Sequence, residues 1–321
     1  MKLSLPRLTF ALAAVAASFL TLGASQVSAH SPNKAEDAAT PAVELVPRGE
    51  KTALLLVFHG SPAPSWSKFT GKMVDRVRAL NEKSPVFAVV EGAQMEFSKA
   101  PNDIASAYKR IEEKGCDAVV AVPVFVYPTS HVQFDVASIL GIYASAEMRA
   151  ALAEEGIQVV RSKIPTVATP TLSSGDLLKN FVVAEARSIS KEPKNERLLV
   201  IAHGDEGYAG LVDSLNEDAL KAAAELGFDR VDAAFCGIGQ TFAENVKPIV
   251  EANDRDGKKT LIVAIYVASS AENFVARLQK GENGAKNSLE GLNYECSKGA
   301  LGDFEETAPW IFELGREASL F

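Results

Sequence analysis

The sequence predicts an α/β protein of two homologous lobes, each a parallel β-sheet flanked by helices, with a cleft between the lobes. Three observations predict this fold. Short apolar runs alternate with longer amphipathic segments from about residue 51 onward. The apolar runs are continuous in Val, Ile and Leu, which is typical of strands that helices cover on both faces. The pattern of the first half is then repeated in the second.

The elements of the first half are punctuated by ordinary start and stop signals. The first strand ends at a His-Gly turn, and the second helix has Pro101 near its start and Gly115 at its end. We expect strands at 52–58, 86–94, 117–127 and 157–165, and helices at 65–83 and 100–115.

The repeat is visible at three landmarks. "RLLVIAHGDEG" parallels "ALLLVFHGSPA", "VDAAFCGIG" parallels "VFAVVEGAQ", and "KTLIVAIYVASSAENF" parallels "DAVVAVPVFVYPTSHVQF". The landmarks keep their order, at offsets of about 141 to 145 residues. We therefore expect an N-terminal lobe at 51–175 and a C-terminal lobe at 190–321.

Composition excludes some classes of protein. The 321 residues are 47% hydrophobic and 23% charged, which suits a globular chain with a substantial core. The formal net charge of −8, with both signs interspersed, gives no basic surface for nucleic acid. The three cysteines, Cys116, Cys236 and Cys296, are far apart in the sequence. We expect them to be thiols in the core, although the sequence also allows one disulfide.

The N-terminus has the features of an export signal. Lys2 and Arg7 precede a long apolar stretch, and a small-residue site ends at Ala29. Residues 1–29 are expected to be a cleaved signal peptide and 30–50 a flexible lead-in, which places the protein in the periplasm with no stable membrane span. An uncleaved membrane anchor is the alternative, because the apolar run is near the shortest length that spans a bilayer.

Four residues of the N-terminal lobe could carry chemistry. His59 follows the first strand and His131 follows the third, so both belong at the edge where parallel sheets bind ligands. Neutral imidazoles there could meet one small ligand or one metal ion. Glu91 and Glu96 lie between them, and either carboxylate could ligate a divalent cation or accept protons. The sequence alone leaves the choice between the two carboxylates open.

Motifs of other enzyme classes do not occur. "FHGSP" and "AHGDEG" are not Gly-x-Ser-x-Gly elbows, no Gly-rich loop with Lys-Ser or Lys-Thr is found, and His-Glu-x-x-His is absent. Hydrolase interpretations are therefore disfavoured.

Three stretches of the N-terminal lobe resemble the class II tetrapyrrole chelatases. They are "LLLVFHGSP" with His59, "MEFSKAPNDIASAYKRIEEKGCDAVVAVPVF" with Glu96, and "PTSHVQFD" with His131. They occur in the order found in the sirohydrochlorin cobaltochelatases of the CbiX and CbiK type. The C-terminal lobe resembles the family more weakly.

The resemblance implies ATP-independent insertion of Co2+ into sirohydrochlorin or a related metal-free tetrapyrrole. His59 and His131 would ligate the metal and accept protons, with Glu96 as third ligand or proton relay. Ser61 and Ser130, beside the two histidines, would contact the bound ligand. Co2+ is the substrate metal that the family implies, whereas Ni2+, Fe2+ or Zn2+ would also suit imidazole and carboxylate ligands, and no organic cofactor is expected.

Two departures from the family keep other functions open. The C-terminal lobe has His203, but Glu272 falls near the position that matches His131, so we expect one active site, in the N-terminal lobe. The export signal is unusual for corrinoid assembly. An exported carrier that binds a metal or a haem-like ligand without turnover is the alternative, and a clamshell protein for an unrelated solute is a third. An oligomer is possible.

Overall fold

The computed structural model describes residues 50–97, 99–143, 145–204, 211–236, 241–281 and 283–320. All of them lie in one compact unit that spans 46–321. The predicted signal peptide and the lead-in up to residue 49 lie outside the described residues, so cleavage after Ala29 stays a prediction. In the part of the chain that is described, no helix has both the length and the hydropathy needed to cross a bilayer.

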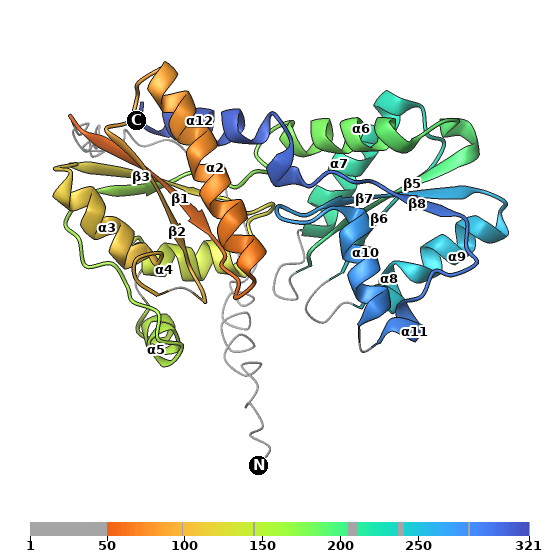
Figure 1. Ribbon diagram of the computed structural model, residues 1–321, viewed down its shortest axis with the longest axis horizontal. Helices are drawn as coiled ribbons and strands as arrows, with labels where there is room; N and C mark the ends of the chain where they lie inside the picture. The colour runs from red at the N-terminus through yellow and green to blue at the C-terminus, as the bar shows by residue number, and fades with distance from the viewer. Residues whose placement is uncertain are drawn as a thin grey trace, which may run out of the picture. The chain divides into compact units, whose positions relative to one another are not determined.

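The N-terminal lobe contains four parallel strands in the order β2-β1-β3-β4, of which Figure 1 labels β1, β2 and β3. Helix α3 begins after Asp103, whose carboxylate accepts a hydrogen bond from the backbone N–H of Ser106. The elements are β1 (Thr52–Phe58), α2 (Pro64–Lys83), β2 (Val89–Gln94), α3 (Ile104–Glu113), β3 (Ala118–Pro123), η2 (His131–Val136), α4 (Ala137–Ile139), α5 (Ala146–Glu154) and β4 (Thr166–Ala168).

The C-terminal lobe has the same architecture. Its parallel strands follow the order β6-β5-β7-β8, which is the order of the N-terminal lobe shifted by four strands. The repeat predicted from the sequence is thus present in the fold. The elements are α6 (Leu177–Ile189), η3 (Pro193–Asn195), β5 (Glu196–Ala202), α7 (Leu211–Leu226), β6 (Val231–Phe235), α8 (Phe242–Asn245), α9 (Lys247–Arg255), β7 (Lys259–Ile265), α10 (Ala271–Lys280), α11 (Gly284–Asn287), β8 (Tyr294–Cys296), η4 (Leu301–Asp303) and α12 (Thr307–Ala318).

The fourth strand lies later in the chain than predicted. The structure places β4 at Thr166–Ala168, whereas the prediction of a strand at 157–165 is wrong. In that segment the Val160 N–H donates to the Ile139 carbonyl of α4 at 2.8 Å rather than to a neighbouring strand. Its apolar side chains pack against the core beneath α3 and α4. A short apolar run predicts burial, and here burial occurs without strand pairing.

The continuous apolar runs are explained by two covered faces. In β1, Leu54, Leu56 and Phe58 pack in the core formed with α2 and α12, whereas Leu55 and Val57 pack in the core formed with α3. Each of these side chains is at most 1% exposed. The strand therefore needs apolar residues at every position, as the sequence pattern indicated.

All three cysteines are free thiols, so none forms the disulfide that the sequence left open. Cys116 and Cys236 are buried and Cys296 is half-buried. Burial raises the pKa of the Cys236 thiol to about 11 and that of Cys296 to about 12, which keeps both protonated at neutral pH. They are core thiols, as expected.

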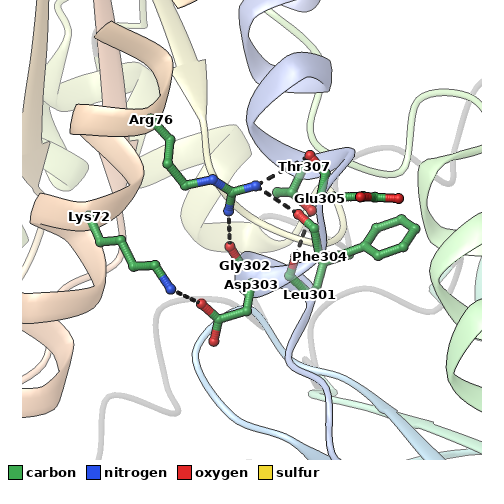
Figure 2. Close-up of polar contacts among 8 residues, drawn as sticks. All are labelled: Lys72, Arg76, Leu301, Gly302, Asp303, Phe304, Glu305 and Thr307. Carbon is green, nitrogen blue, oxygen red and sulfur yellow. Dashed lines mark hydrogen bonds and ion pairs between the residues drawn. The ribbon is translucent and has the colours of Figure 1, made fainter. Parts of the chain in front are cut away.

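The last two helices, η4 and α12, return from the C-terminal lobe to the N-terminal lobe, and we call the segment 301–318 the crossing. Helix α12 falls within the predicted C-terminal lobe, 190–321, and packs against α2 and β3 (Figure 1). Figure 2 shows the polar contacts between α2 and the crossing. The Arg76 guanidinium donates to the carbonyls of Gly302 at 2.8 Å and Phe304 at 3.0 Å. Lys72 forms an ion pair with Asp303 at 2.6 Å. Helix α6, in the connection between the lobes, packs against α7 and β7.

One apolar core continues through both lobes. It contains side chains of β1 and α2 together with those of β5, β7 and α7. Tyr127, in the segment between β3 and η2, is 2% exposed within it, and its hydroxyl donates to Oδ2 of Asp218 on α7 at 3.1 Å. The segment that leads to His131 is thereby tied to the C-terminal lobe.

Candidate metal centre

His59 is positioned by a tight turn at the carboxyl end of β1. The next residue, Gly60, has a φ of 107°, which residues with a side chain rarely adopt. A Cβ added to Gly60 would lie 2.0 Å from the backbone oxygen of Glu96. The Glu96 N–H also donates to the His59 carbonyl at 2.8 Å. The turn after β1 therefore lies against the segment after β2, and this contact brings Glu96 beside His59.

His131 begins the π-helical turn η2, a type of turn that is frequent at functional sites. Its Nδ1 lies 2.6 Å from Oδ2 of Asp135, four residues further along the turn. Because an ionised carboxylate can only accept a hydrogen bond, Nδ1 donates and the lone pair of the neutral ring lies on Nε2. In His59, Nδ1 donates to the Gly60 carbonyl at 2.9 Å. Both imidazoles therefore offer Nε2 for ligation.

The structure brings His59, Glu96 and His131 together. One ligand atom from each residue lies within 4.8 Å of the other two. Nε2 of His59 is 3.9 Å from Oε2 of Glu96. Nδ1 of His131, the nitrogen that donates to Asp135, is 3.8 Å from Oε1 of the same carboxylate, so the His131 ring lies beside Glu96. Ligand atoms about 2.0–2.2 Å from one ion lie roughly 3–3.5 Å apart. The three side chains are therefore close enough to converge on one divalent metal after side-chain rotation.

The triad is partly open to solvent. The exposed fractions of its side chains lie between 20% and 36%. Structural metal sites are closed by four protein ligands, whereas sites that act on a substrate keep a position open. Within the described ranges, the triad is the single group of three or more His, Cys, Asp or Glu residues that could hold a metal. The arrangement suits a metal that enters and leaves.

Further carboxylates surround the two imidazoles. Glu155 follows α5, and burial raises the pKa of its carboxyl, which the carboxylates of Glu96 and Asp135 raise further while His131 lowers it. Glu155 is thus electrostatically coupled to the site. The resulting negative potential favours a divalent cation over an anion at this edge of the sheet.

The structure separates Glu91 from Glu96, the two carboxylates that the residues alone left open and between which the family resemblance favoured Glu96. Glu91 lies within β2, opposite Leu55 of β1, rather than after the strand. Its Oε2 accepts a hydrogen bond from Nε of Arg110 at 3.0 Å. Glu91 therefore belongs to an ion pair between β2 and α3, and Glu96 is the carboxylate that meets the histidines.

The two predicted ligand-contacting serines lie next to the histidines in the chain. Ser61 is half-buried, and its Oγ accepts from the Ala63 N–H at 3.2 Å. Ser130 is half-buried directly before η2. Sequence reasoning missed Asp135 and Glu155. The spacing of four residues between His131 and Asp135 on a helical turn could have indicated the first, whereas no sequence signal indicated Glu155.

The C-terminal lobe retains one part of the site. Nδ1 of His203 donates to the Gly204 carbonyl at 2.9 Å, the same contact that His59 makes with Gly60. Glu272, near the position that matches His131, is exposed at the start of α10 and pairs with Lys298 at 3.9 Å. Across the described residues, no His-Glu-His group forms in this lobe. That the N-terminal lobe holds the one active site stays a prediction.

Two parallel α/β lobes, one of which carries a His-Glu-His group, agree with the resemblance to the class II chelatases seen in the sequence. Comparison with known proteins points to the same family. Residues 53–187, which contain the whole triad, match the CbiX family model.

Curated relatives match a shorter stretch of the chain. A sirohydrochlorin cobaltochelatase of Methanococcus maripaludis is 33% identical over 91 residues, which are 28% of this chain and 59% of the relative. One of Methanopyrus kandleri is 31% identical over 90 residues, which are 28% of this chain and 59% of the relative. The chain thus spans less than two thirds of these relatives.

Solved structures share the fold. SirB from Bacillus subtilis with Fe3+ has a TM-score of 0.61 and 16% identity, over 84% of this chain and 96% of that chain. CbiX, described as the terminal enzyme for biosynthesis of siroheme in denitrifying bacteria, has a TM-score of 0.53 and 18% identity, over 83% and 99% of the two chains. Because these similarities cover more than four fifths of the chain, they include both lobes.

Proposed function

We propose that this protein inserts a divalent metal ion into sirohydrochlorin or a related metal-free tetrapyrrole without ATP. The observation that carries the proposal is the His59, Glu96 and His131 triad at the strand ends of a segment that matches the CbiX family. The names of the curated relatives supply the reaction and its tetrapyrrole substrate.

The chemistry assigns a task to each residue of the triad. Insertion replaces two pyrrole N–H protons by one metal ion, so the site must hold the ion beside the ring and accept two protons. His59 and His131 would ligate the ion through Nε2, with Glu96 as third ligand. As the ion passes to the ring nitrogens, the same three groups regain their lone pairs and can take up the protons. Asp135 would hold the His131 ring in the ligating orientation.

Aromatic side chains beside the triad suit a flat macrocycle. Phe97, which follows Glu96, is 68% exposed, and Phe134, which precedes Asp135, is 38% exposed. Phe97 also has a φ of 52°, an uncommon conformation for a residue with a side chain. Exposed rings at this position could pack on the face of a tetrapyrrole. Ser61 and Ser130 would donate hydrogen bonds to its polar substituents.

Co2+ is the metal we propose. The curated relatives are named cobaltochelatases, and SirB has been solved with cobalt and with Fe3+. Imidazole and carboxylate ligands bind Co2+, Ni2+, Fe2+ and Zn2+ in an order that the metal sets more than the protein. We therefore expect several of these ions to be inserted in vitro.

We further propose that the protein acts in the periplasm after cleavage behind Ala29, on the basis of the N-terminal signal pattern. An exported carrier without turnover is less well supported, because the curated relatives that the chain matches are named as chelatases.

A matrix of metals against tetrapyrroles tests the proposal. Purified mature protein is mixed with Co2+, Ni2+, Fe2+ or Zn2+ and with sirohydrochlorin or a porphyrin, and insertion is followed by absorbance. We expect the fastest insertion with Co2+ and sirohydrochlorin, well above the rate without protein. Stoichiometric binding of the tetrapyrrole with no acceleration for any metal would instead favour the carrier.

A further inference from the structure

A second cavity lies in the N-terminal lobe, and no residue of the triad lines it. It has a volume of about 910 Å3 and lies among α3, α4, α5 and the irregular segment 157–162. This segment forms one wall and runs past α4, where the Val160 N–H donates to the Ile139 carbonyl. Its volume is that of an ordinary small-molecule site.

The cavity is positively charged in a protein that is negative as a whole. Its lining includes Lys109 of α3, Arg149 of α5 and Arg161, and a single acidic residue, Glu112. Glu112 accepts a hydrogen bond from the Ser162 hydroxyl at 2.7 Å. In the described part of the chain, no carboxylate lies within ion-pair distance of any of the three cations. The chain carries a formal net charge of −8, so this local excess of positive charge departs from the general balance.

A buried hydroxyl in the wall of the same cavity lacks a partner. Ser138 of α4 is 1% exposed, and its Oγ has no hydrogen-bond partner among the described residues. Buried hydroxyls are normally hydrogen-bonded, because leaving one unpaired costs about 1–3 kcal/mol. The exposed ring of Tyr143 lines the cavity nearby. An acceptor atom of a ligand would satisfy Ser138, and the ring would cover an organic body.

We infer that this cavity binds a small organic polyanion, one that carries at least two phosphate or carboxylate groups. The guanidinium groups of Arg149 and Arg161 suit such groups because each can donate two parallel hydrogen bonds to an oxyanion. Lys109 adds a third charge, and the Ser138 hydroxyl donates to an oxygen of the ligand. This inference is independent of the proposed chelatase activity.

Calorimetric titration of the full-length protein, free of metal and tetrapyrrole, tests the inference. The probes are glucose 1,6-bisphosphate and citrate at constant ionic strength, two organic polyanions that distinguish phosphate from carboxylate groups. We expect saturable binding of one molecule per chain for at least one probe, and weaker binding as NaCl is raised. Absence of saturation by both probes in the millimolar range would overturn the inference.

Substitutions in the cavity test whether the polyanion binds there. Arg149→Gln and Arg161→Gln should each weaken the affinity at least about tenfold, as the loss of a charge-assisted hydrogen bond predicts. Ser138→Ala should weaken it severalfold without lowering the melting temperature, because it removes an unpaired buried hydroxyl. Arg255→Gln, at the exposed end of α9, is the matched control and should bind as the wild type does. An equal loss in Arg255→Gln and Arg161→Gln would show non-specific attraction and refute the site.

Discussion

The buried carboxyl of Asp218 makes protein stability depend on pH in a direction that can be predicted. Burial is the largest cause that raises the pKa of Asp218 from 3.8 to about 6, and the carboxylates of Glu217 and Asp176 also raise it. The hydrogen bond from Tyr127 and the charge of Lys221 lower the pKa, but by less. Asp218 is 7% exposed, so solvent screens these effects little.

The direction in which stability changes with pH follows from proton binding to Asp218. Between pH 4 and 6 the folded protein holds a proton on Asp218 that the unfolded chain releases, so the contribution of Asp218 to stability falls as the pH rises through this range. The difference between 3.8 and about 6 corresponds to about 3 kcal/mol lost by pH 7. In Asp218→Asn the amide oxygen can still accept from Tyr127, and no charge is buried.

We therefore expect Asp218→Asn to be more stable than the wild type by about 2–3 kcal/mol at pH 8 but by only about 1 kcal/mol at pH 4.5, where most of the folded protein still carries the proton. Urea unfolding at both pH values measures the difference. Asp229→Asn, which changes an exposed aspartate after α7, is the control and should differ little at either pH. Loss of stability in Asp218→Asn at pH 8 would refute the reasoning, because it would mean that the charged form is favoured in the fold.

Three further predictions concern the site and the crossing. Asp135→Ala should weaken Co2+ binding about 10–100-fold in a calorimetric titration, because His131 loses its orienting partner; unchanged affinity would contradict that role. Gly60→Ala should destabilise the protein by at least about 2 kcal/mol in urea and weaken Co2+ binding, since its Cβ meets the Glu96 backbone. Arg76→Ala should cost about 2–3 kcal/mol, whereas Lys72→Ala, which removes an exposed ion pair, should cost less than about 1 kcal/mol. Equal losses in both variants would show that the Arg76 hydrogen bonds do not hold the crossing.

The sequence predicted the strands that are buried on both faces and misplaced the short, partly exposed β4. β1 lies at the residues predicted for it, and β5 lies in the repeat of that run, since both are continuous apolar runs that lead to a His-Gly turn. The run 157–165 also contains several apolar residues, but these pack on the core of the N-terminal lobe without pairing as a strand. Hydrophobicity predicts that a segment is buried and leaves open which surface covers it.

The sequence likewise leaves open which surface the crossing contacts and which residues meet at the site. The apolar face of α12 predicts a packed helix, but nothing in its sequence tells which sheet it covers. His59 could be predicted from its position at a strand end, and His131, which begins η2 beyond the end of β3, from its place after the third strand. The residues alone left Glu91 and Glu96 open, and the family resemblance favoured Glu96. The physical reason lies in the fold, because Glu91 pairs with Arg110 and Gly60 contacts the Glu96 backbone closely.

The rate of Co2+ insertion into sirohydrochlorin by paired glutamate variants tests the central claim most directly. Glu96→Gln removes the carboxylate of the triad, whereas Glu91→Gln changes a carboxylate five residues away that pairs with Arg110. We expect Glu96→Gln to lose at least about 90% of the activity, since one general acid–base group contributes roughly 10²–10⁴-fold. Glu91→Gln should retain most of it. Equal rates in the two variants, or no acceleration by the wild type, would contradict the account.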